Sequence, residues 1–254
     1  MQENPNSKYV LHSVANTLDI IDLLAKHEEL TVPEIASLTG FNKSSVFRML
    51  ATLEEKNFVH KSADAKYSLD VKLIFLGNTV SRRLDVIKFG HPMLMELTKR
   101  SGETSHIHML DRDVYVRVID KVLSSSAIRT DSYIGFCRRA HLMAGGKAIL
   151  AFQTPSFLES YSRVSSFEPL TDYSITSPEQ LMRELKEVRR LGYALDREES
   201  EYGLFCIGAP IFNASRNVVA AVSISGPVDR MKKNFDANLP LVLKTAEDIS
   251  EFIS

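Results

Sequence analysis

Apolar residues in the N-terminal part of the chain recur at the spacing of an amphipathic helix. The first seven residues are polar and have no apolar period, so we expect residues 1–7 to form a disordered arm. Beyond this arm, Ser13 is a candidate N-cap, and the helix that it begins is expected to end around His27. The stripe that this helix would bury consists of Val14, Leu18, Ile21 and Leu24.

Two shorter helices separated by a tight turn are predicted next. Thr31 is a candidate cap of the first, with Glu34 at capping-box distance and Gly40 at its end. Asn42 is a candidate cap of the second, which is expected to run from Lys43 to about residue 56. Two capped helices joined in this way form a helix-turn-helix.

The second of these helices has two different faces. Its apolar face consists of Val46, Met49, Leu50 and Leu53. Its opposite face consists of Ser44, Phe47, Arg48, Ala51 and Thr52, with Ser45 at the edge and Lys43 at the N-terminus. Such a face suits the major groove of DNA, because arginine can form two hydrogen bonds with guanine and apolar groups can contact the thymine methyl group. A solvated helix face would show the same pattern, so that alternative stays open on the helix alone.

Two short strand patterns, residues 58–61 and 66–69, flank a polar turn and predict a hairpin. Lys61 and Lys66 would stand on its two strands, as expected for a wing that reaches phosphate or the minor groove. The formal net charge of the chain is -1, so only a local excess of cations can support DNA binding. Residues 40–66 carry five cations against three anions, which is a modest basic patch.

Residues 71–84 predict a linker helix that is apolar around most of its circumference and ends in Arg82 and Arg83. A helix of this kind between two domains is expected to pack against a second copy of the chain. Packing against its own C-terminal domain is the alternative.

From residue 85 the pattern is mixed. A helix to about residue 100 closed by Gly102 is followed by alternating strand patterns, two further helices, two further strands and a closing helix from about Leu239. The predicted strands are residues 104–110, 114–119, 204–211 and 218–224, and the two helices between them are residues 144–152 and 178–191. A central antiparallel sheet with helices on its faces is the simplest arrangement of these elements.

Several classes of protein are disfavoured by what the chain lacks. Two cysteines, Cys137 and Cys206, are too few for a disulfide framework, and no leader pattern opens the chain, so we expect a cytoplasmic protein. The apolar runs are far shorter than the roughly twenty residues that span a bilayer, so no membrane association is expected. His106 and His108 share a strand face, but two candidate ligands do not predict a metal site, and we expect neither a metal nor a cofactor. Gly146–Lys147 lacks the flanking residues of a phosphate-binding loop, and no nucleophile motif is present.

The chain resembles the isocitrate-lyase-regulator (IclR) family of transcription factors along nearly its whole length. The N-terminal segments that carry the resemblance are residues 30–36, 43–50 and 66–69, and the C-terminal ones are residues 101–104, 141–148, 192–196, 206–211 and 223–227. The resemblance implies that the helix from Lys43 is the recognition helix and that the linker region dimerises. The DNA-binding residues expected on this basis are Thr31, Lys43, Ser44, Ser45, Phe47, Arg48, Lys61 and Lys66.

The same resemblance implies a GAF-like C-terminal domain with a pocket for a small organic acid. Backbone N–H groups of Ala144 and Gly145 would bind an acceptor on the ligand. The pocket would be lined by Asp196, Cys206, Ser223 and Ser225 as polar groups and by Leu204 as an apolar wall. Ser223 and Ser225 also satisfy the alternation that turns two strand residues to one face. A tight loop at Gly145, a buried hydrophobic role for Cys206 and a capping or ion-pairing role for Asp196 are the alternatives.

We therefore expect an N-terminal α/β winged helix-turn-helix (residues 8–70), a linker helix (71–84) and a C-terminal α+β GAF-like domain with a central antiparallel sheet (85–254). The expected function is that of a transcriptional repressor whose binding to a palindromic DNA operator is modulated by a small organic or sugar acid. The expected assembly is a homodimer or a dimer of dimers, because a two-fold dimer places two recognition helices on two half-sites. The alternative is an enzyme that acts on a small acid and carries an accessory DNA-binding module, with Asp196, Cys206 and His141 as reactive groups.

Overall fold

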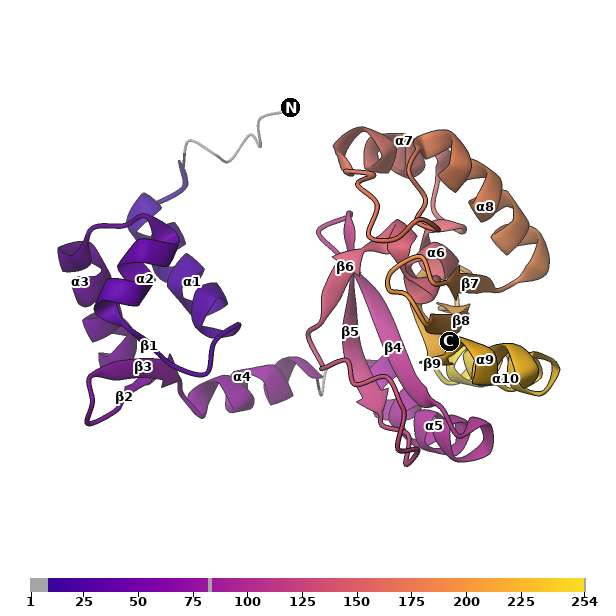
Figure 1. The fold of residues 1–254 in the computed structure, drawn as a ribbon, viewed down its shortest axis with the longest axis horizontal. Helices are drawn as coiled ribbons and strands as arrows, with labels where there is room; N and C mark the ends of the chain where they lie inside the picture. Colours follow the sequence, from indigo (N-terminus) through magenta and orange to yellow (C-terminus); the bar gives the residue numbers. More distant parts are fainter. Residues whose placement is uncertain (1–8, 82–83, 254) are drawn as a thin grey trace. The chain divides into compact units, whose positions relative to one another are not determined.

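The computed structural model describes residues 9–81 and 84–253 and divides the chain into two compact units, Met1–Arg83 and Leu84–Ser254 (Figure 1). The arm expected at residues 1–7 and the two arginines at the end of the linker lie outside the described residues.

The first unit is a winged helix-turn-helix, as the capping signals predict. Its elements are α1 (His12–Leu24), β1 (Leu30–Thr31), α2 (Val32–Thr39), α3 (Lys43–Glu55), β2 (Val59–Lys61) and β3 (Lys66–Leu69). Gly40 ends α2 in the left-handed conformation at φ 75°, and the Asn42 side chain caps α3 by accepting a hydrogen bond from the backbone N–H of Ser45 at 2.8 Å. The strands form an antiparallel sheet in the order β1-β3-β2. Its core is built by Ile20, Ile35, Val46, Leu50 and Tyr67, among others.

The stripe predicted for α1 is wrong in its N-terminal half. Val14 and Leu18 are 51% and 55% exposed, whereas Ile20 and Leu24 are buried. The helix begins at His12 without a side-chain cap, so Ser13 does not have the predicted capping role. Two apolar stripes share this helix, and only the stripe that contains Ile20 and Leu24 faces the core of the unit, which leaves the other stripe uncovered in the single chain.

The predicted linker region contains α4 (Lys72–Ser81). Most of its large apolar side chains are uncovered: Ile74, Phe75 and Val80 are 64%, 68% and 59% exposed. An exposed apolar helix face of this kind is a candidate contact surface.

The second unit confirms the predicted α+β class with a central antiparallel sheet (Figure 1). The six strands lie in the order β6-β5-β4-β9-β8-β7, and every pair is antiparallel. Their bounds are β4 (Thr104–Asp111), β5 (Tyr115–Val122), β6 (Cys137–Arg139), β7 (Ala194–Arg197), β8 (Leu204–Phe212) and β9 (Val218–Pro227). The edge strands β6 and β7 were not predicted from the sequence.

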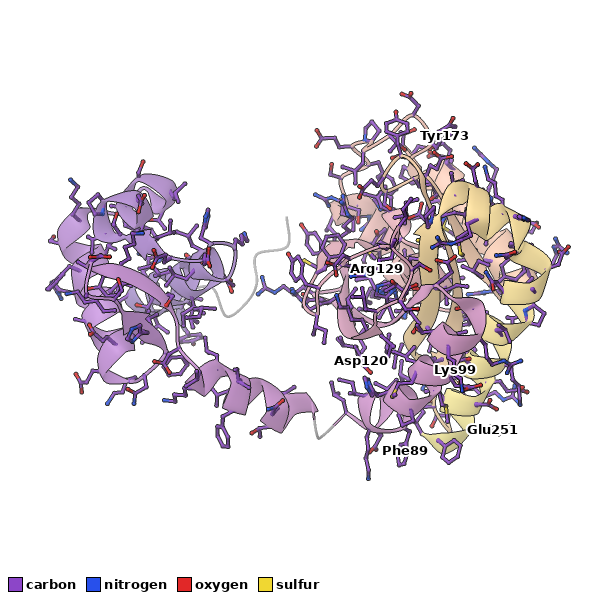
Figure 2. The ribbon with its side chains drawn as sticks, turned by 60° about the horizontal axis from the view of Figure 1, so that its bottom comes forward. Phe89, Lys99, Asp120, Arg129, Tyr173 and Glu251 are labelled. Atoms are coloured by element: carbon purple, nitrogen blue, oxygen red, sulfur yellow. The ribbon has the colours of Figure 1, made fainter. Side chains whose placement is uncertain are left out.

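Helices cover both faces of this sheet, so the unit has two apolar cores. One core joins the sheet to α5 (Asp85–Ser101), α9 (Val228–Lys233) and α10 (Phe235–Phe252). The other joins it to α6 (Ala144–Leu150), α7 (Pro155–Val164) and α8 (Pro178–Leu191). Phe89 of α5 stacks on Phe252 of α10 with ring centroids 5.9 Å apart, and Figure 2 shows Phe89 and Glu251 at the same end of these two helices.

The sequence predicted α8 with its correct ends, because Ser177 caps it through the Gln180 N–H and Gly192 ends it at φ 80°. It did not predict α7. Among the described residues, no helix is both long and apolar enough to cross a membrane.

Candidate functional site

The exposed face of α3 contains the side chains predicted for DNA recognition. Lys43, Ser44, Phe47 and Arg48 are exposed and Ser45 is partly buried, while Val46, Leu50 and Leu53 of the opposite face are buried. The Ser44 hydroxyl donates to Asn42 Oδ1 at 2.8 Å, which fixes it at the start of the helix. Arg48 has no ion-pair partner within residues 9–81 and 84–253, so its guanidinium remains available to an external acceptor.

Two of the three residues that were predicted to contact DNA outside α3 have partners within the unit. Lys66 forms an ion pair with Glu29, and this hydrogen bond raises the pKa of the lysine. The Thr31 hydroxyl donates to Glu34 Oε2 at 2.7 Å, and the Thr31 backbone N–H donates to the same oxygen, which lowers the pKa of Glu34. Lys61 is exposed, with its ammonium group 5.6 Å from the centroid of the Tyr67 ring. Thr31 and Lys66 therefore stabilise the unit itself, and a contact of either with DNA would compete with an internal partner.

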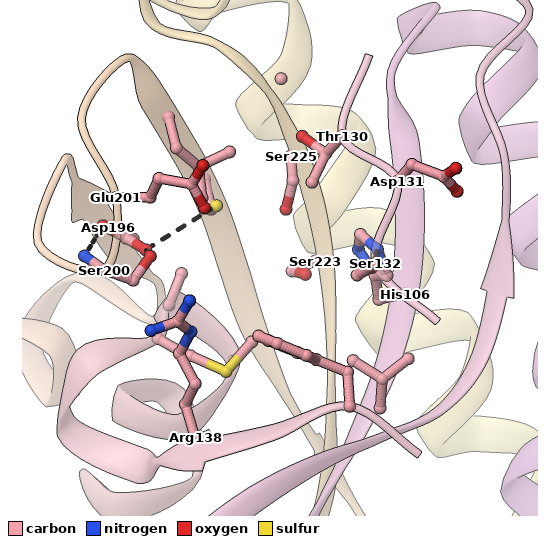
Figure 3. Close-up of a pocket in the computed structure, with 18 of the residues that line it drawn as sticks. His106, Thr130, Asp131, Ser132, Arg138, Asp196, Ser200, Glu201, Ser223 and Ser225 are labelled. Atoms are coloured by element: carbon pink, nitrogen blue, oxygen red, sulfur yellow. Dashed lines mark hydrogen bonds between the residues drawn. The ribbon is translucent and has the colours of Figure 1, made fainter. Parts of the chain in front are cut away.

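A cavity of about 470 Å³ lies in the second unit, against one face of the sheet (Figure 3). It is enclosed by β4, β9, the loop between β5 and β6, the start of α6 and the turn between β7 and β8. All seven residues predicted for the effector pocket line this cavity: Ala144, Gly145, Asp196, Leu204, Cys206, Ser223 and Ser225. The structure thus brings together residues that lie up to about eighty positions apart in the sequence.

Close backbone approach explains the two glycines at the start of α6. A Cβ atom on Gly146 would lie 2.1 Å from the carbonyl oxygen of Ala140, and one on Gly145 would lie 2.4 Å from Cδ2 of His108. Neither glycine has a positive φ, and both lie within the helix rather than in a tight loop. Their role is to let α6 pack directly against neighbouring segments at the cavity.

Asp196 combines two roles that the sequence left as alternatives. It lines the cavity, and its carboxylate also holds the turn after β7, accepting from the Glu199 N–H at 2.8 Å and from the Ser200 hydroxyl at 2.5 Å. Burial raises its pKa, against the opposing effect of the Ser200 hydrogen bond. Arg197 is not its partner, because that side chain pairs with Glu184 at 3.4 Å.

Cys206 is buried beside Asp196, with its Sγ 4.0 Å from the carboxylate. Burial raises the pKa of the thiol well above its usual value, and the charge of Asp196 acts in the same direction. The thiol is therefore protonated at neutral pH, which disfavours a nucleophilic role. It serves as a small, weakly polar part of the cavity wall.

The sequence did not identify two further pairs of pocket residues. His108 Nε2 lies 2.8 Å from the Ser223 hydroxyl, and His106 Nε2 lies 2.7 Å from the Ser132 hydroxyl. Ser132 comes from the loop between β5 and β6, which has no periodic pattern. Arg129 and Arg138 also line the cavity and supply positive charge to it.

Lys147 is fully buried behind the cavity and binds carboxylates rather than phosphate. Its ammonium group lies 2.6 Å from both carboxylate oxygens of Glu199 and 3.2 Å from Glu184. This ion pair ties α6 to α8 and to the turn that follows Asp196. In the part of the chain that the structure describes, no group of three or more His, Cys, Asp or Glu side chains is arranged to hold a metal ion.

Two family models match this chain. The IclR helix-turn-helix domain matches residues 13–63, and the bacterial transcriptional regulator IclR C-terminal domain matches residues 78–251. YiaJ of Escherichia coli, a DNA-binding transcriptional repressor, is 32% identical over 94% of this chain and 86% of its own length.

Solved structures show the same architecture. The IclR protein of Thermotoga maritima is 34% identical, with a TM-score of 0.78 over 95% of this chain and 98% of its own. An IclR homologue from Microbacterium hydrocarbonoxydans, complexed with 4-hydroxybenzoate, has a TM-score of 0.84 over 95% of this chain and 98% of its own. At 18% identity, its likeness to this chain concerns the fold alone.

Proposed function

The chain belongs to the IclR family of bacterial transcriptional regulators, which have a helix-turn-helix DNA-binding domain and an effector-binding C-terminal domain, and we propose that it is a repressor controlled by a small acid. The observation that carries this proposal is the presence in one chain of an exposed face on α3 with polar side chains and a cavity in the second unit that has arginine and serine side chains in its lining. The known relatives are regulators, so the chain is a regulator and the alternative of an enzyme is set aside.

The proposed DNA contacts centre on α3. Arg48 is the candidate for reading guanine and Phe47 for contacting a thymine methyl group. Ser44, whose hydroxyl hydrogen is donated to Asn42, is a candidate for accepting from a base edge. Lys43 and Ser45 at the start of the helix, with Lys61 on the wing, would contact the backbone, and Thr31 and Lys66 would assist once they release their internal partners. The protein would work in the cytoplasm, in agreement with two unpaired cysteines, Cys137 and Cys206.

The proposed effector is a small carboxylate or sugar acid. Arg129 and Arg138 favour an anion in the cavity, and Ser223 and Ser225 add hydroxyl groups on one face of β9. The backbone N–H groups of Ala144 and Gly145 are further candidate donors to the carboxylate. A protein of the same fold is complexed with 4-hydroxybenzoate, which is a small aromatic acid, so this acid is a reasonable first ligand to test.

Three acidic residues line the cavity, Asp131, Asp196 and the exposed Glu201, and they limit which acids can bind. Asp131 is already paired with Lys121 at 3.1 Å, and Asp196 is engaged with its own turn. Because burial raises the pKa of Asp196, protonation of this group would remove the repulsion between it and a bound carboxylate. We therefore propose that acid binding strengthens as the pH falls.

The proposed assembly is a homodimer, or a dimer of dimers, that buries the uncovered faces of the first unit. Ile74, Phe75 and Val80 of α4 carry most of the exposed apolar surface of that helix, and Val14 and Leu18 of α1 add a second apolar stripe. A two-fold dimer would place two copies of α3 on the half-sites of a palindromic operator. Effector binding would then change the spacing of the two α3 helices.

This coupling requires that the acid binds the DNA-free arrangement more tightly than the DNA-bound one. The test is a titration of 4-hydroxybenzoate and succinate into the protein bound to DNA from upstream of its own gene, followed by fluorescence anisotropy. We expect at least one acid to release the DNA from the wild-type protein but not from Ser223→Val. Val164→Ser, an exposed position on α7, is the matched control and should respond as the wild type does. Acids that bind the protein yet leave operator affinity and oligomeric state unchanged would contradict the proposal.

A further inference from the structure

Two histidines of β4 lie in the wall of the cavity, and each forms a hydrogen bond with a serine hydroxyl. His106 and His108 are each 2% exposed, and the centroids of their rings are 5.6 Å apart. His106 Nε2 lies 2.7 Å from Ser132 Oγ, and His108 Nε2 lies 2.8 Å from Ser223 Oγ. All four residues line the cavity, and Figure 3 shows His106 beside Ser132, with Ser223 next to them on β9.

The protonation of these rings follows from their surroundings. Burial lowers the pKa of His108 to about 4 and lowers that of His106 well below its usual value, so both rings are neutral at pH 7. A neutral imidazole carries one N–H group, on either Nδ1 or Nε2. The Nδ1 atoms of both rings are sealed from solvent and have no hydrogen-bond partner within the described residues.

An N–H group on either Nδ1 would therefore be a buried donor without an acceptor, which is rare in folded proteins and costs about 1–3 kcal/mol. An N–H group on Nε2 has the serine oxygen as its acceptor. Both histidines are thus expected to carry the proton on Nε2 and to donate to the serines. Each serine oxygen then accepts from a histidine, and its own hydroxyl hydrogen is left to point elsewhere.

Nothing in the described chain accepts those two hydroxyl hydrogens. The hydrogen bonds recorded for the Ser132 and Ser223 hydroxyls are the two from the histidines. Arg129 and Arg138 add guanidinium donors to the same cavity. Together these groups offer more donors than the roughly four hydrogen bonds that a single carboxylate accepts.

We propose that His106 and His108 are positioning residues that turn the hydroxyls of Ser132 and Ser223 into donors, so that the cavity selects an acid with a second acceptor group, such as a dicarboxylate. The inference rests on the proposed effector function and adds the chemical class of the ligand. At the Ser132 and Ser223 hydroxyls, a ligand with an amine or ammonium group at its second end would place a donor against donors, so this part of the cavity disfavours it.

The first test measures the tautomers directly, without any ligand. Long-range ¹H–¹⁵N correlation spectra of the ¹⁵N-labelled full chain distinguish the two neutral tautomers and the imidazolium, and His106→Gln and His108→Gln assign the signals. We expect the Nε2–H pattern for both residues at pH 7. An Nδ1–H pattern or an imidazolium at either position would overturn the assignment of the serines as donors.

The second test measures ligand choice by calorimetry, with three acids that share a four-carbon chain: succinate, butyrate and 4-aminobutyrate. We expect succinate to bind the wild type at least about tenfold more tightly than butyrate, and 4-aminobutyrate to bind most weakly. His108→Leu, which removes the donor to Ser223, should lose about tenfold in succinate affinity, whereas the amide of His108→Gln can replace the donor and should retain most of it. His91→Gln on α5, outside the cavity lining, is the control and should bind as the wild type does.

The results distinguish a failure of the positioning role of the histidines from a failure of the proposed acid effector. If the wild type binds all three acids alike, or if His108→Leu and His108→Gln bind succinate equally well, the positioning role is refuted while an acid effector remains supported. If the wild type binds none of the acids, the proposed acid effector fails, and with it the ligand class inferred here. In that case the tautomer spectra still decide the orientation of the serine hydroxyls.

Discussion

Lowering the pH from 7 to 5 should destabilise the second unit through its buried histidines. His108 and His141 are 2% and 0% exposed, and burial lowers the pKa of each from 6.5 to about 4. His141 is enclosed by the Tyr161 hydroxyl, 2.8 Å from its Nδ1, and by the stacked ring of Phe167. Between pH 4 and 6.5 the unfolded chain binds protons that the folded chain cannot, so stability falls as the pH falls.

The magnitude follows from the two pKa values. At pH 5, a histidine with a pKa of 6.5 when unfolded and about 4 when folded loses about 2 kcal/mol of stability. Two such residues give about 4 kcal/mol, and His106, whose pKa is also lowered, adds to the loss. Asp196 and Glu199 act in the opposite direction, because burial raises their pKa values and protonation at low pH relieves the cost of burying their charges. We therefore expect a net loss of about 2–4 kcal/mol.

The measurement is urea denaturation of the full chain at pH 7 and pH 5, followed by far-UV circular dichroism, because the chain has no tryptophan. His108→Gln should reduce the difference between the two pH values by about 2 kcal/mol. His60→Gln, an exposed position in the first unit, is the control and should leave the difference as it is. A free energy of unfolding that stays constant or rises as the pH falls from 7 to 5 would show that the buried histidines do not destabilise the folded chain at low pH.

Three further predictions concern the glycines at the start of α6, the apolar face of α4 and the carboxylate of Asp196. Gly146→Ala should destabilise the second unit by about 3 kcal/mol or more, because its Cβ would meet the backbone oxygen of Ala140 at 2.1 Å. Gly145→Ala should cost less, because its Cβ would meet the side chain of His108, which can shift toward the cavity at the cost of its hydrogen bond to Ser223. Urea denaturation of both variants tests this, and equal losses would contradict it. Replacing the exposed Ile74 and Phe75 of α4 by serine should convert the proposed dimer to monomers, because it removes apolar surface from the proposed interface. Analytical ultracentrifugation measures this, and Val164→Ser, at an exposed position on α7, should leave the assembly unchanged. A double variant that remains dimeric would exclude α4 as the interface. Acid affinity should rise as the pH falls in the wild type and rise less in Asp196→Asn, because burial raises the pKa of Asp196 and its protonation removes a negative charge from the cavity wall. Calorimetry at several pH values checks this, and an unchanged pH dependence in the variant would exclude Asp196 as the titrating group.

The helix-turn-helix could be predicted from the sequence because its signals are local. The hydrogen bond from the Ser45 N–H to Asn42, the αL glycine at position 40 and the buried Val46 and Leu50 all depend on residues close together in the chain. The stripe on α1 was predicted incorrectly because two apolar stripes share that helix. Periodicity shows that Leu18 and Ile20 are apolar, but only tertiary packing determines which of them faces the core.

The pocket could be predicted only in part, and only through the family resemblance. The seven residues carried over from that resemblance do line one cavity, but Ser132, His106 and His108 required the structure. Ser132 lies in a loop without periodic pattern, and its pairing with His106 spans 26 positions. Lys147 is another such case, because a lysine is usually exposed and only the burial of Glu199 beside it explains why this one is not.

The most direct test of the regulator is the salt dependence of its binding to DNA from upstream of its own gene, measured by anisotropy for the wild type, Arg48→Ala and Arg163→Ala. Arg163 is an exposed arginine on α7 and serves as the charge-matched control. If α3 is the recognition helix, binding is specific and steeply salt-dependent, Arg48→Ala weakens it by about 1–3 kcal/mol, and Arg163→Ala leaves it unchanged. Weak binding that is equal on unrelated DNA and indifferent to Arg48 would contradict the assignment of α3 as the recognition helix.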